Sequence, residues 1–325
     1  MENLAHTLTG ACLASAGFQA RVGRKTALAV GIVAANLPDV DLVTSFVAGP
    51  DYYRDWHRGI THSLAALAVA PPLLAAAIAR ATGKTSFRPL WLLATLAYAS
   101  HIVLDWVTSW GTMVLLPWSD RRFAAHWLFI VDPWLWVVLT LPAWLGIVLR
   151  RRTTVLSRIA IGLLTGYVGG NGLLHHMAVT RVRDAAARQG IAARYVQAYP
   201  TPFSPARWHG VVVDGGYLHM ASIDLRRDGA TVLDRLQPRN LGEPAVDAVA
   251  RTLRGRRFLD WWADTPYATA TWNGNSCEVS LADMRYNDPL VARPGFELVF
   301  HVARDAAGGL TVDTPAWRTA WSGGR

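Results

Sequence analysis

The chain has 325 residues, of which 52% are hydrophobic and 17% charged. Soluble domains usually carry about a quarter charged residues, so this composition favours a membrane protein over a disordered chain or a nucleic-acid-binding arm. The formal net charge is +9, but the basic residues are spread along the chain, and no nucleic acid partner is expected. Cys12 and Cys277 are too far apart in sequence to suggest a disulfide framework or a Cys-based zinc site.

Six apolar segments precede residue 179, and charged residues become frequent after them. A bilayer span needs about 20 mainly apolar residues, so the fourth, fifth and sixth segments qualify, the third is close, and the first two are weaker. A large soluble helical core is the alternative, because Pro71 and Pro72 are awkward inside a span. In chain order the segments are Asn3–Ala20, Thr26–Ala48, Ser63–Ala79, Leu90–Trp110, Trp127–Leu149 and Ile159–Val179.

The loops between these segments differ in charge, and the difference predicts an orientation. Odd-numbered loops carry ten basic residues and even-numbered loops only four, partly offset by acids. Loops rich in Lys and Arg stay in the cytoplasm, so we expect the N-terminus and the C-terminal region outside. The odd-loop residues are Arg21, Arg24, Lys25, Arg80, Lys84, Arg88, Arg150, Arg151, Arg152 and Arg158, and the even-loop residues are Arg54, Arg58, Arg121 and Arg122, offset by Asp51, Asp55 and Asp120.

From about residue 180 the pattern changes to short alternating runs separated by turn signals. Arg181–Gln197 resembles an amphipathic helix and Pro244–Arg254 a short one, whereas Gly215-Gly216 and Asn273-Gly274 mark turns. The sequence therefore predicts a mainly α chain, with a multi-pass helical membrane domain over residues 1–178 and an α+β domain of unassigned role over residues 179–325. The strand-like runs are Trp208–Val213, Tyr217–Leu225, Ala268–Trp272, Glu278–Ala282 and Glu297–Val302.

The ionisable residues in or beside the apolar segments form a restricted set of His and Asp. Such residues are costly in a membrane and usually mark a functional site, and His and Asp are ligand types that suit zinc and related divalent metals. Met1–Ala20 lacks the basic start of a secretory signal, so this segment and its His6 are expected to be retained in the mature protein. The set comprises His6, Asp39, Asp41, His57, His62, His101, Asp105 and Asp132.

The spacing within this set supports one site. His101 and Asp105 are four residues apart in a helical pattern, so their side chains share one face. Asp39 and Asp41 follow a turn broken by Pro38. If the segments cross the membrane alternately, all the groups fall at the same end of the bundle, opposite the basic loops. We therefore expect them to converge on one or more metal ions.

Each residue also has a simpler interpretation, although the set as a whole favours a metal site. Outside the set, His209, His219 and His301 lie in the strand-rich region and are expected to be surface or sheet residues. The simpler interpretations are a core position for His6, an i,i+4 polar pair for His101 and Asp105, helix caps for Asp39, Asp41 and Asp132, and a carboxylate partner for Arg58.

Four motifs follow one another along the first part of the chain: Asn36-Leu-Pro-Asp-Val-Asp41, His57-Arg-Gly-Ile-Thr-His-Ser63, Ser100-His-Ile-Val-Leu-Asp105 and Gly111-Thr-Met-Val-Leu-Leu-Pro117. In this order they resemble the motifs of the bacterial YdjM-type inner-membrane metal-dependent hydrolases. The added Val131-Asp-Pro-Trp134 and the C-terminal region resemble the YfhP-like branch. The resemblance covers roughly residues 1–180 and implies a helical fold related to zinc-dependent phospholipase C and single-strand nucleases.

The resemblance implies a His/Asp site for one or more metals. Zinc is the metal expected first, with Mn²⁺ and Mg²⁺ as alternatives. Asp41 and Asp132 match only the longer members of the family, and either could orient a ligand or act as a general base. Arg58 could bind a phosphate through a bidentate pair of hydrogen bonds. The residues that match the family pattern as metal ligands are His6, Asp39, His57, His62, His101 and Asp105.

The expected function is that of a hydrolase in the bacterial inner membrane, acting on an ester or phosphoester that a lipid or envelope molecule could provide. Its metal would activate a water and polarise the scissile group. The predicted orientation puts the site and the C-terminal domain outside the cytoplasm. The rival is a non-enzymatic membrane protein that uses the same His/Asp cluster to sense or conduct metal ions or protons.

Overall fold

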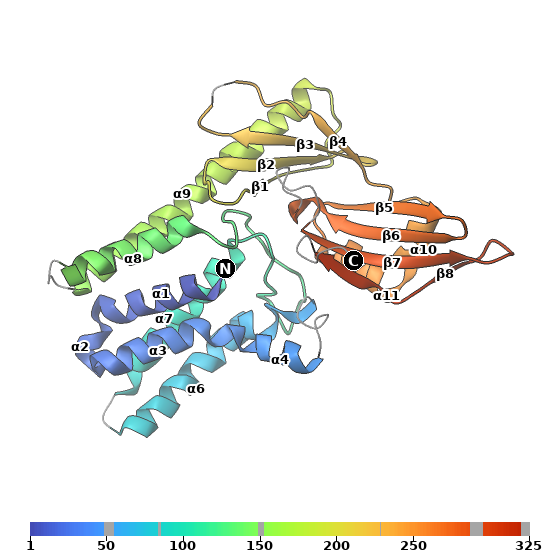
Figure 1. Cartoon of the computed structure of the whole chain (residues 1–325). Coiled ribbons are helices and arrows are strands. Elements are labelled where there is room, and N and C mark those ends of the chain that lie inside the picture. Colours follow the sequence, from blue (N-terminus) through green and yellow to red (C-terminus); the bar gives the residue numbers. More distant parts are fainter. Residues whose placement is uncertain (49–54, 84–85, 149–152, 228, 287–294, 320–325) are drawn as a thin grey trace. The chain divides into compact units, whose positions relative to one another are not determined.

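The computed structural model describes residues 1–48, 55–83, 86–148, 153–227, 229–286 and 295–319 (Figure 1). These residues form two compact units, Met1–Leu173 and Leu174–Arg325. The division falls inside helix α9 (Thr153–Arg188), the same helix that contains the boundary predicted between residues 178 and 179. Some residues used in the orientation and segment predictions lie outside the described ranges, namely Asp51, Arg54, Lys84, Leu149, Arg150, Arg151 and Arg152.

The first unit is a bundle of helices, as the sequence predicts. Helix α1 contacts α3, α7 and α8, and α7 also contacts α3 and α6 (Figure 1). A π-helical turn and the short α2 join α1 to α3, and short 3-10 turns follow α3 and precede α6. The bounds are α1 Asn3–Leu13, η1 Ala14–Phe18, α2 Gln19–Val22, α3 Arg24–Asn36, η2 Leu37–Val40, α4 Asp41–Ala48, η3 Ile60–His62, α6 Leu64–Thr82, α7 Phe87–Trp106 and α8 Pro133–Val148.

Helices α1 and α3 pack with their backbones in contact, where two glycines face each other. A Cβ added at Gly10 would lie 2.3 Å from the carbonyl oxygen of Gly31, and one added at Gly31 would lie 2.4 Å from that of Gly10. No side chain larger than hydrogen fits at either position without moving a helix. Gly10 lies one helical turn after His6 on the same face, so this contact also fixes the place of His6 in the bundle.

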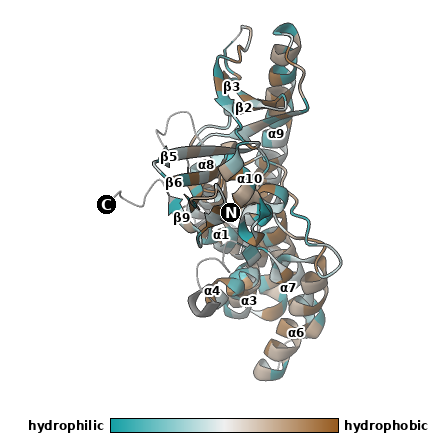
Figure 2. Cartoon of the chain, turned by 90° about the vertical axis from the view of Figure 1, so that its right-hand side faces the viewer, coloured by the Kyte–Doolittle hydropathy of each residue, from teal (hydrophilic) through white to brown (hydrophobic). Residues whose placement is uncertain are grey.

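Three stretches of the described residues are long and apolar enough to cross a bilayer: Arg24–Thr44, Leu64–Thr82 and Phe87–Trp106. They correspond to the second, third and fourth predicted segments. Helix α6 shows the exposure expected of a lipid-facing helix, since Leu73 is 64% exposed and Val69 is 56% exposed. The ribbon of this helix is coloured largely as hydrophobic in Figure 2. The first unit therefore contains several candidate membrane helices.

The fifth and sixth predicted segments differ from the expectation. Residues 127–132 are not helical, so α8 begins only at Pro133 and offers a shorter apolar stretch, Pro133–Pro142. The sixth segment lies in α9 but is not among the three candidates, because glycines, Asn171 and two histidines dilute its apolar residues. A run of apolar residues therefore predicted the start of α8 too early, and it did not reflect the mixed composition of α9.

The second unit contains two antiparallel sheets. The strands of the first have the spatial order β1-β2-β3-β4. One face of this sheet packs on the C-terminal half of α9, where Val182 and Ala185 are buried with Trp208 and Ile223. The strand bounds are β1 Tyr195–Pro200, β2 Arg207–Val213, β3 Tyr217–Asp224 and β4 Arg235–Pro238.

The second sheet has the order β5-β6-β7-β8, with β9 paired to β7. Helix α10 (Pro244–Arg251) contacts strands of this sheet, and α11 (Leu253–Arg257) follows it. Residues of both sheets, among them Tyr199, Leu218 and Tyr267, form one buried cluster. The bounds are β5 Pro266–Asn273, β6 Ser276–Asp283, β7 Phe296–Arg304, β8 Leu310–Val312 and β9 Ala316–Thr319.

The predicted strands and turns of this region are confirmed in β2, β3, β5, β6 and β7, and α10 confirms the start of the predicted short helix. The helix predicted over Arg181–Gln197 is wrong in its second half. Helix α9 ends at Arg188, Gly190 adopts a φ of 68°, and β1 begins at Tyr195. A glycine in the left-handed region is a common helix terminator, and the following Tyr and Val favour strands.

Candidate metal centre

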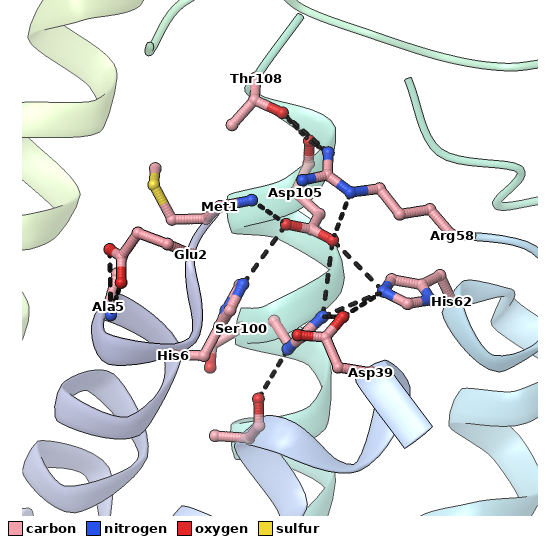
Figure 3. Close-up of polar contacts among 12 residues, drawn as sticks. Met1, Glu2, Ala5, His6, Asp39, Arg58, His62, Ser100, Asp105 and Thr108 are labelled. Carbon is pink, nitrogen blue, oxygen red and sulfur yellow. Dashed lines mark hydrogen bonds and ion pairs between the residues drawn. The ribbon is translucent and has the colours of Figure 1, made fainter. Parts of the chain in front are cut away.

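Four buried side chains from three segments of the first unit converge on one point: Asp39, His62, His101 and Asp105. Figure 3 shows Asp39, His62 and Asp105 pointing toward one another. Asp39 lies in turn η2 after α3, His62 ends turn η3 before α6, and the other two lie near the end of α7. One ligand atom of each residue lies within 4.8 Å of the ligand atoms of the others. Since neighbouring spans run in opposite directions, these chain positions coincide at one end of the bundle.

The distances between these ligand atoms match the edges of a coordination tetrahedron. Nε2 of His62 lies 3.1 Å from Nε2 of His101. The same nitrogen is 3.4 Å from Oδ1 of Asp39 and 3.3 Å from Oδ2 of Asp105. Nε2 of His101 is 3.5 Å from each of these carboxylate oxygens. Zinc bonds of about 2.0–2.1 Å place tetrahedral ligand atoms about 3.3 Å apart, so the group fits a small divalent cation.

The hydrogen bonds around the two histidines direct their Nε2 atoms toward this point. Nδ1 of His101 lies 2.6 Å from the carbonyl oxygen of Ala35, which can only accept, so Nδ1 carries the proton. Nε2 of the neutral ring then has a free lone pair. Nδ1 of His62 lies 3.0 Å from the hydroxyl of Thr61 and 3.6 Å from Oδ2 of Asp41. Lone pairs and carboxylates that face one another this closely require a proton or a cation between them.

Arg58 is a buried partner of the centre. Its side chain is 2% exposed, and Nε lies 2.9 Å from Oδ2 of Asp105. Nη1 donates to the carbonyl oxygen of Asp105 at 3.1 Å and to the hydroxyl of Thr108 at 2.8 Å (Figure 3). The simpler interpretation of the sequence, in which Arg58 pairs with a carboxylate, describes this geometry. The guanidinium positions Asp105 and is already engaged by protein groups.

The backbone around Arg58 explains the glycine that follows it in the motif. Arg58 has a φ of 63°, in the left-handed region. A Cβ added at Gly59 would lie 2.6 Å from the carbonyl oxygen of Trp56. The chain therefore turns sharply at this point, and the turn carries the Arg58 side chain into the bundle while His57 stays near the surface.

His6 packs beside the four converging residues. It is fully buried, and its ring stacks on that of His101 with centroids 3.7 Å apart. Its Nε2 lies 3.3 Å from Oδ1 of Asp105, the oxygen that also contacts the terminal amine of Met1 (Figure 3). His6 belongs to neither of the two His/Asp groups found among the described residues. The structure thus places it against the site without adding it to the donor set.

A second His/Asp group lies next to the first and shares Asp39 with it. Its members are Asp39, Asp41 and His57. Nδ1 of His57 lies 3.1 Å from Oδ1 of Asp41, and these two side chains are 10% and 11% exposed. Burial lowers the pKa of His57, which favours the neutral imidazole that binds metals. This group is closer to the surface than the first.

Asp132 has a different environment from the other predicted site residues. Its Oδ1 accepts hydrogen bonds from the backbone N–H groups of Trp134 at 2.9 Å and Leu135 at 3.3 Å. Its Oδ2 accepts from the hydroxyl of Tyr167 at 2.8 Å. These bonds make it the N-cap of α8, as the simpler interpretation proposed, and it belongs to neither His/Asp group of the described residues.

Two threonines support the site and were not singled out from the sequence. The hydroxyl of Thr61 donates to Oδ2 of Asp41 at 3.2 Å, and that of Thr108 accepts from Arg58. Thr61 stands inside the His57–Ser63 motif, so its position beside His62 was the available signal. Thr108 follows Asp105 by three residues, in the region where α7 ends, and no pattern in the sequence distinguishes it.

Comparison with known proteins places the first unit in a family. The family model described as YdjM inner membrane protein matches residues 1–177. The chain is 39% identical over 130 residues to the inner membrane protein YbcI of Escherichia coli strain K12, which covers 39% of this chain and 73% of YbcI. It is 28% identical over 143 residues to YfhP of Bacillus subtilis strain 168, covering 42% of this chain and 43% of YfhP. No solved structure matches the chain significantly. The match over residues 1–177, which include both His/Asp groups, shows that the chain belongs to the YdjM inner membrane protein family.

Proposed function

We propose that this protein is a membrane-bound metal-dependent hydrolase of an ester or phosphoester. The observation that carries the proposal is a group of five ligand-atom distances of 3.1–3.5 Å, which join two imidazoles to each other and to two carboxylates, all almost completely buried. Two nitrogen and two oxygen donors suit zinc, and Mn²⁺ is the main alternative. The proposed fold relation to zinc-dependent phospholipase C belongs to the same hypothesis.

The residues around the donors have distinct roles in this proposal. When bound, the metal supplies an activated water and a Lewis acid for the scissile group. Arg58 holds Asp105 in place, and the carbonyl of Ala35 fixes the tautomer of His101. Asp41 lies beside both His57 and His62 and is therefore the better candidate than Asp132 for orienting a histidine or accepting a proton.

The family and the position of the site support the proposed substrate class. The donors lie at one end of apolar helices in an inner membrane protein family. An ester or phosphoester of a lipid or of an envelope precursor can reach such a place from the bilayer surface. We propose the bilayer as the partner of the first unit and, from the loop charges, the outer side as the location of the site.

The proposal is tested on the full chain purified in detergent. Metal is removed with a chelator, and Zn²⁺, Mn²⁺ or Mg²⁺ is restored before hydrolysis of bis-p-nitrophenyl phosphate and p-nitrophenyl butyrate is followed. We expect metal-dependent turnover that His62→Ala and His101→Ala reduce by more than about 100-fold. Changing a residue that only supports a ligand typically costs about 10–100-fold. His301→Ala, at an exposed histidine of β7, is the matched control and keeps wild-type activity.

A different outcome identifies the rival function. Tight metal binding without turnover of either substrate would contradict the hydrolase and favour a role in metal sensing or transport. The 3.1 Å approach of the two Nε2 atoms also suits a shared proton. If the purified protein binds no divalent metal and proton uptake depends on His62 and His101, the cluster is a proton relay.

A further inference from the structure

The chain between α7 and α8 forms a hairpin, Thr112–Phe123, whose tip is apolar and exposed. The backbone groups of Thr112 and Phe123 exchange two hydrogen bonds, at 2.9 and 3.0 Å. At the tip the chain turns back, and the N–H of Trp118 donates to the carbonyl oxygen of Leu115 at 2.9 Å. Trp118 is 77% exposed, and Leu115 and Pro117 are exposed beside it. None of these three residues belongs to the candidate metal centre.

Backbone hydrogen bonds fix the hairpin beside the start of α6. The N–H of Leu64, the first residue of α6, donates to the carbonyl oxygen of Val114 at 2.9 Å. The N–H of Met113 donates to the carbonyl oxygen of Arg58 at 2.9 Å. Trp118 follows Val114 by only four residues, so the tip stays close to the first turn of α6.

The length of α6 sets the level of its first residue in a bilayer. This candidate span has 19 residues, and at about 1.5 Å per residue it is about 28 Å long. The hydrocarbon core of a bilayer is about 30 Å thick, so the helix needs its whole length to cross. Leu64 then lies at the boundary between hydrocarbon and headgroups. Leu64 and Ile60, which precedes it, are both exposed, so an apolar surface continues from α6 to the hairpin tip.

Other exposed tryptophans lie at the same end of the bundle. Trp106 is the last residue of α7, Trp134 is the second residue of α8, and Trp56 precedes turn η3; all three are exposed. The end of α7 and the starts of α6 and α8 meet where the His/Asp residues lie. Tryptophan is enriched at membrane–water interfaces, because its ring is apolar and its N–H can bond to water or headgroups. The distribution of tryptophan thus indicates an interface at the level of the tip, independently of the length of α6.

We propose that the tip of the Thr112–Phe123 hairpin enters the headgroup region of the adjacent bilayer leaflet, with Trp118 as its anchor. The bilayer is the occupant that fits, because the tip continues the lipid-facing surface of α6 at the level where that helix leaves the hydrocarbon. Arg121 suits the same place. Its guanidinium carbon lies 5.2 Å from the centroid of the Phe123 ring, which keeps a cation beside the tip where lipid phosphates lie. The inference uses the membrane location of the family and does not depend on hydrolysis.

The test measures the depth of the tip in a bilayer. The full chain carries Cys12→Ser, Cys277→Ser and Trp118→Cys, and the new thiol is labelled with a nitrobenzoxadiazole maleimide. The protein is placed in nanodiscs of phosphatidylethanolamine and phosphatidylglycerol that carry nitroxide either on the headgroup or at the end of the acyl chain. We expect the headgroup nitroxide to cause a large loss of fluorescence, and the chain-end nitroxide and aqueous iodide only a small one. Leu73→Cys, in the middle of α6, is the control and should respond most to the chain-end nitroxide.

A second label tests the role of Trp118 itself. With the dye at Leu115→Cys, we expect Trp118→Ser to increase quenching by iodide, whereas Trp91→Ser, at an exposed tryptophan near the start of α7, leaves it unchanged. Near-ultraviolet circular dichroism checks that each variant keeps its fold.

Strong iodide quenching at both tip positions would place the hairpin in water and overturn the inference. Protection from iodide and from both nitroxides would mean that protein covers the tip, which also overturns it. An unchanged label at position 115 in Trp118→Ser would reject Trp118 as the anchor. A chain with the expected depths but no hydrolysis would reject the proposed function alone.

Discussion

Arg58 and Asp105 form a buried ion pair in which each side chain depends on the other. Their side chains are 2% and 1% exposed, and Nε of Arg58 lies 2.9 Å from Oδ2 of Asp105. Removing one partner of such a pair leaves an uncompensated charge and costs about 3–5 kcal/mol. The pair therefore matters for folding as well as for the metal centre.

We predict that Arg58→Met lowers the free energy of unfolding of the first unit by about 3–5 kcal/mol and weakens metal binding, because Asp105 loses its positioning partner. Unfolding is followed in detergent through the exposure of Cys12 to a maleimide dye, in a Cys277→Ser background. Arg158→Met is the matched control, since that arginine is exposed and bonds only a backbone carbonyl in the described contacts. Equal unfolding temperatures for the two variants would contradict the prediction.

His209 lies in β2, one of the two positions that the sequence suggested, and its side chain is buried. It is 4% exposed, and neither ring nitrogen has a hydrogen-bond partner among the described residues. Burial, together with nearby Arg235, lowers the pKa of His209 from 6.5 to about 4. The folded state therefore keeps the ring neutral at pH values at which the unfolded chain takes up a proton.

This pKa shift predicts a loss of stability in acid. The unfolded chain binds the extra proton between its pKa of 6.5 and the folded value of about 4, so the free energy of unfolding falls as the pH falls through this window. The full effect is about 3 kcal/mol. Urea unfolding of the second unit, followed by tryptophan fluorescence at pH 7.5 and pH 4.5, should show this loss in the wild type and a smaller one in His209→Gln. The same pH dependence in the wild type and in His209→Gln would refute the prediction.

At the scale of elements, the contact between α1 and α3 depends on two glycines. A Cβ at Gly10 would lie 2.3 Å from the carbonyl oxygen of Gly31, so the helices must separate to accept it. Forcing extra atoms into a packed contact typically costs about 1–3 kcal/mol. Because His6 lies on the same face of α1, we expect a shift of this helix to disturb the stacking of its ring on that of His101.

We expect Gly10→Ala to lower the unfolding temperature of the first unit and to weaken its metal binding. Gly166→Ala in α9 is the control, because no atom lies within 4 Å of the Cβ it would add. That change removes a helix-destabilising glycine and should be neutral or stabilising by up to about 1 kcal/mol. The dye reaction of Cys12 measures both variants. A Gly10→Ala protein as stable as Gly166→Ala would show that the helices are not held in this contact.

The elements show which features a sequence can predict. The four-residue spacing of His101 and Asp105 correctly placed both on one face of α7, and the glycine and asparagine turn signals located two hairpins of the second unit. The predicted helix over Arg181–Gln197 was too long, because its arginines continue a helical pattern past the terminating Gly190. The strand Tyr195–Pro200 follows and is completed by its pairing with β2, which local patterns do not report.

The candidate site was predictable in composition but not in geometry. Motif order and residue type identified His62, His101 and the aspartates, yet nothing local distinguished a residue that lies within 3.5 Å of another donor from one that caps a helix. Asp132 and Asp39 both neighbour a proline. Only the folded structure shows that Asp132 caps α8 and that Asp39 belongs to both His/Asp groups. The burial of Arg58 has the same origin, because it depends on the end of α7, 47 residues away.

At the scale of the whole molecule, the loop charges predict a membrane orientation that a reporter experiment can check. The basic loops lie opposite the His/Asp residues, so we expect the C-terminus outside the cytoplasm. Helices α8 and α9 follow each other along the chain. If both cross the bilayer, or if neither does, the chain after α9 lies on the same side of the membrane as the chain before α8. The expectation therefore does not depend on the shorter apolar stretch in α8.

We predict that alkaline phosphatase fused after Arg325 is active and that green fluorescent protein fused there is dark. Fusions to a chain cut after Gly83, in the third loop, should give the reverse pattern and serve as the control. Fluorescence at Arg325 together with inactive phosphatase would reverse the orientation. The candidate site would then lie on the cytoplasmic side, and the choice of candidate substrates would change with it.

The ion pair of Arg58 and Asp105 also bears on the order in which the first unit assembles. Arg58 precedes Asp105 by 47 residues, so its guanidinium has no carboxylate partner until the end of α7 has been synthesised. An unpaired charge is costly to bury, so we expect Arg58 to stay in contact with water until that point. The candidate site is then completed late in synthesis, when its last two ligands emerge.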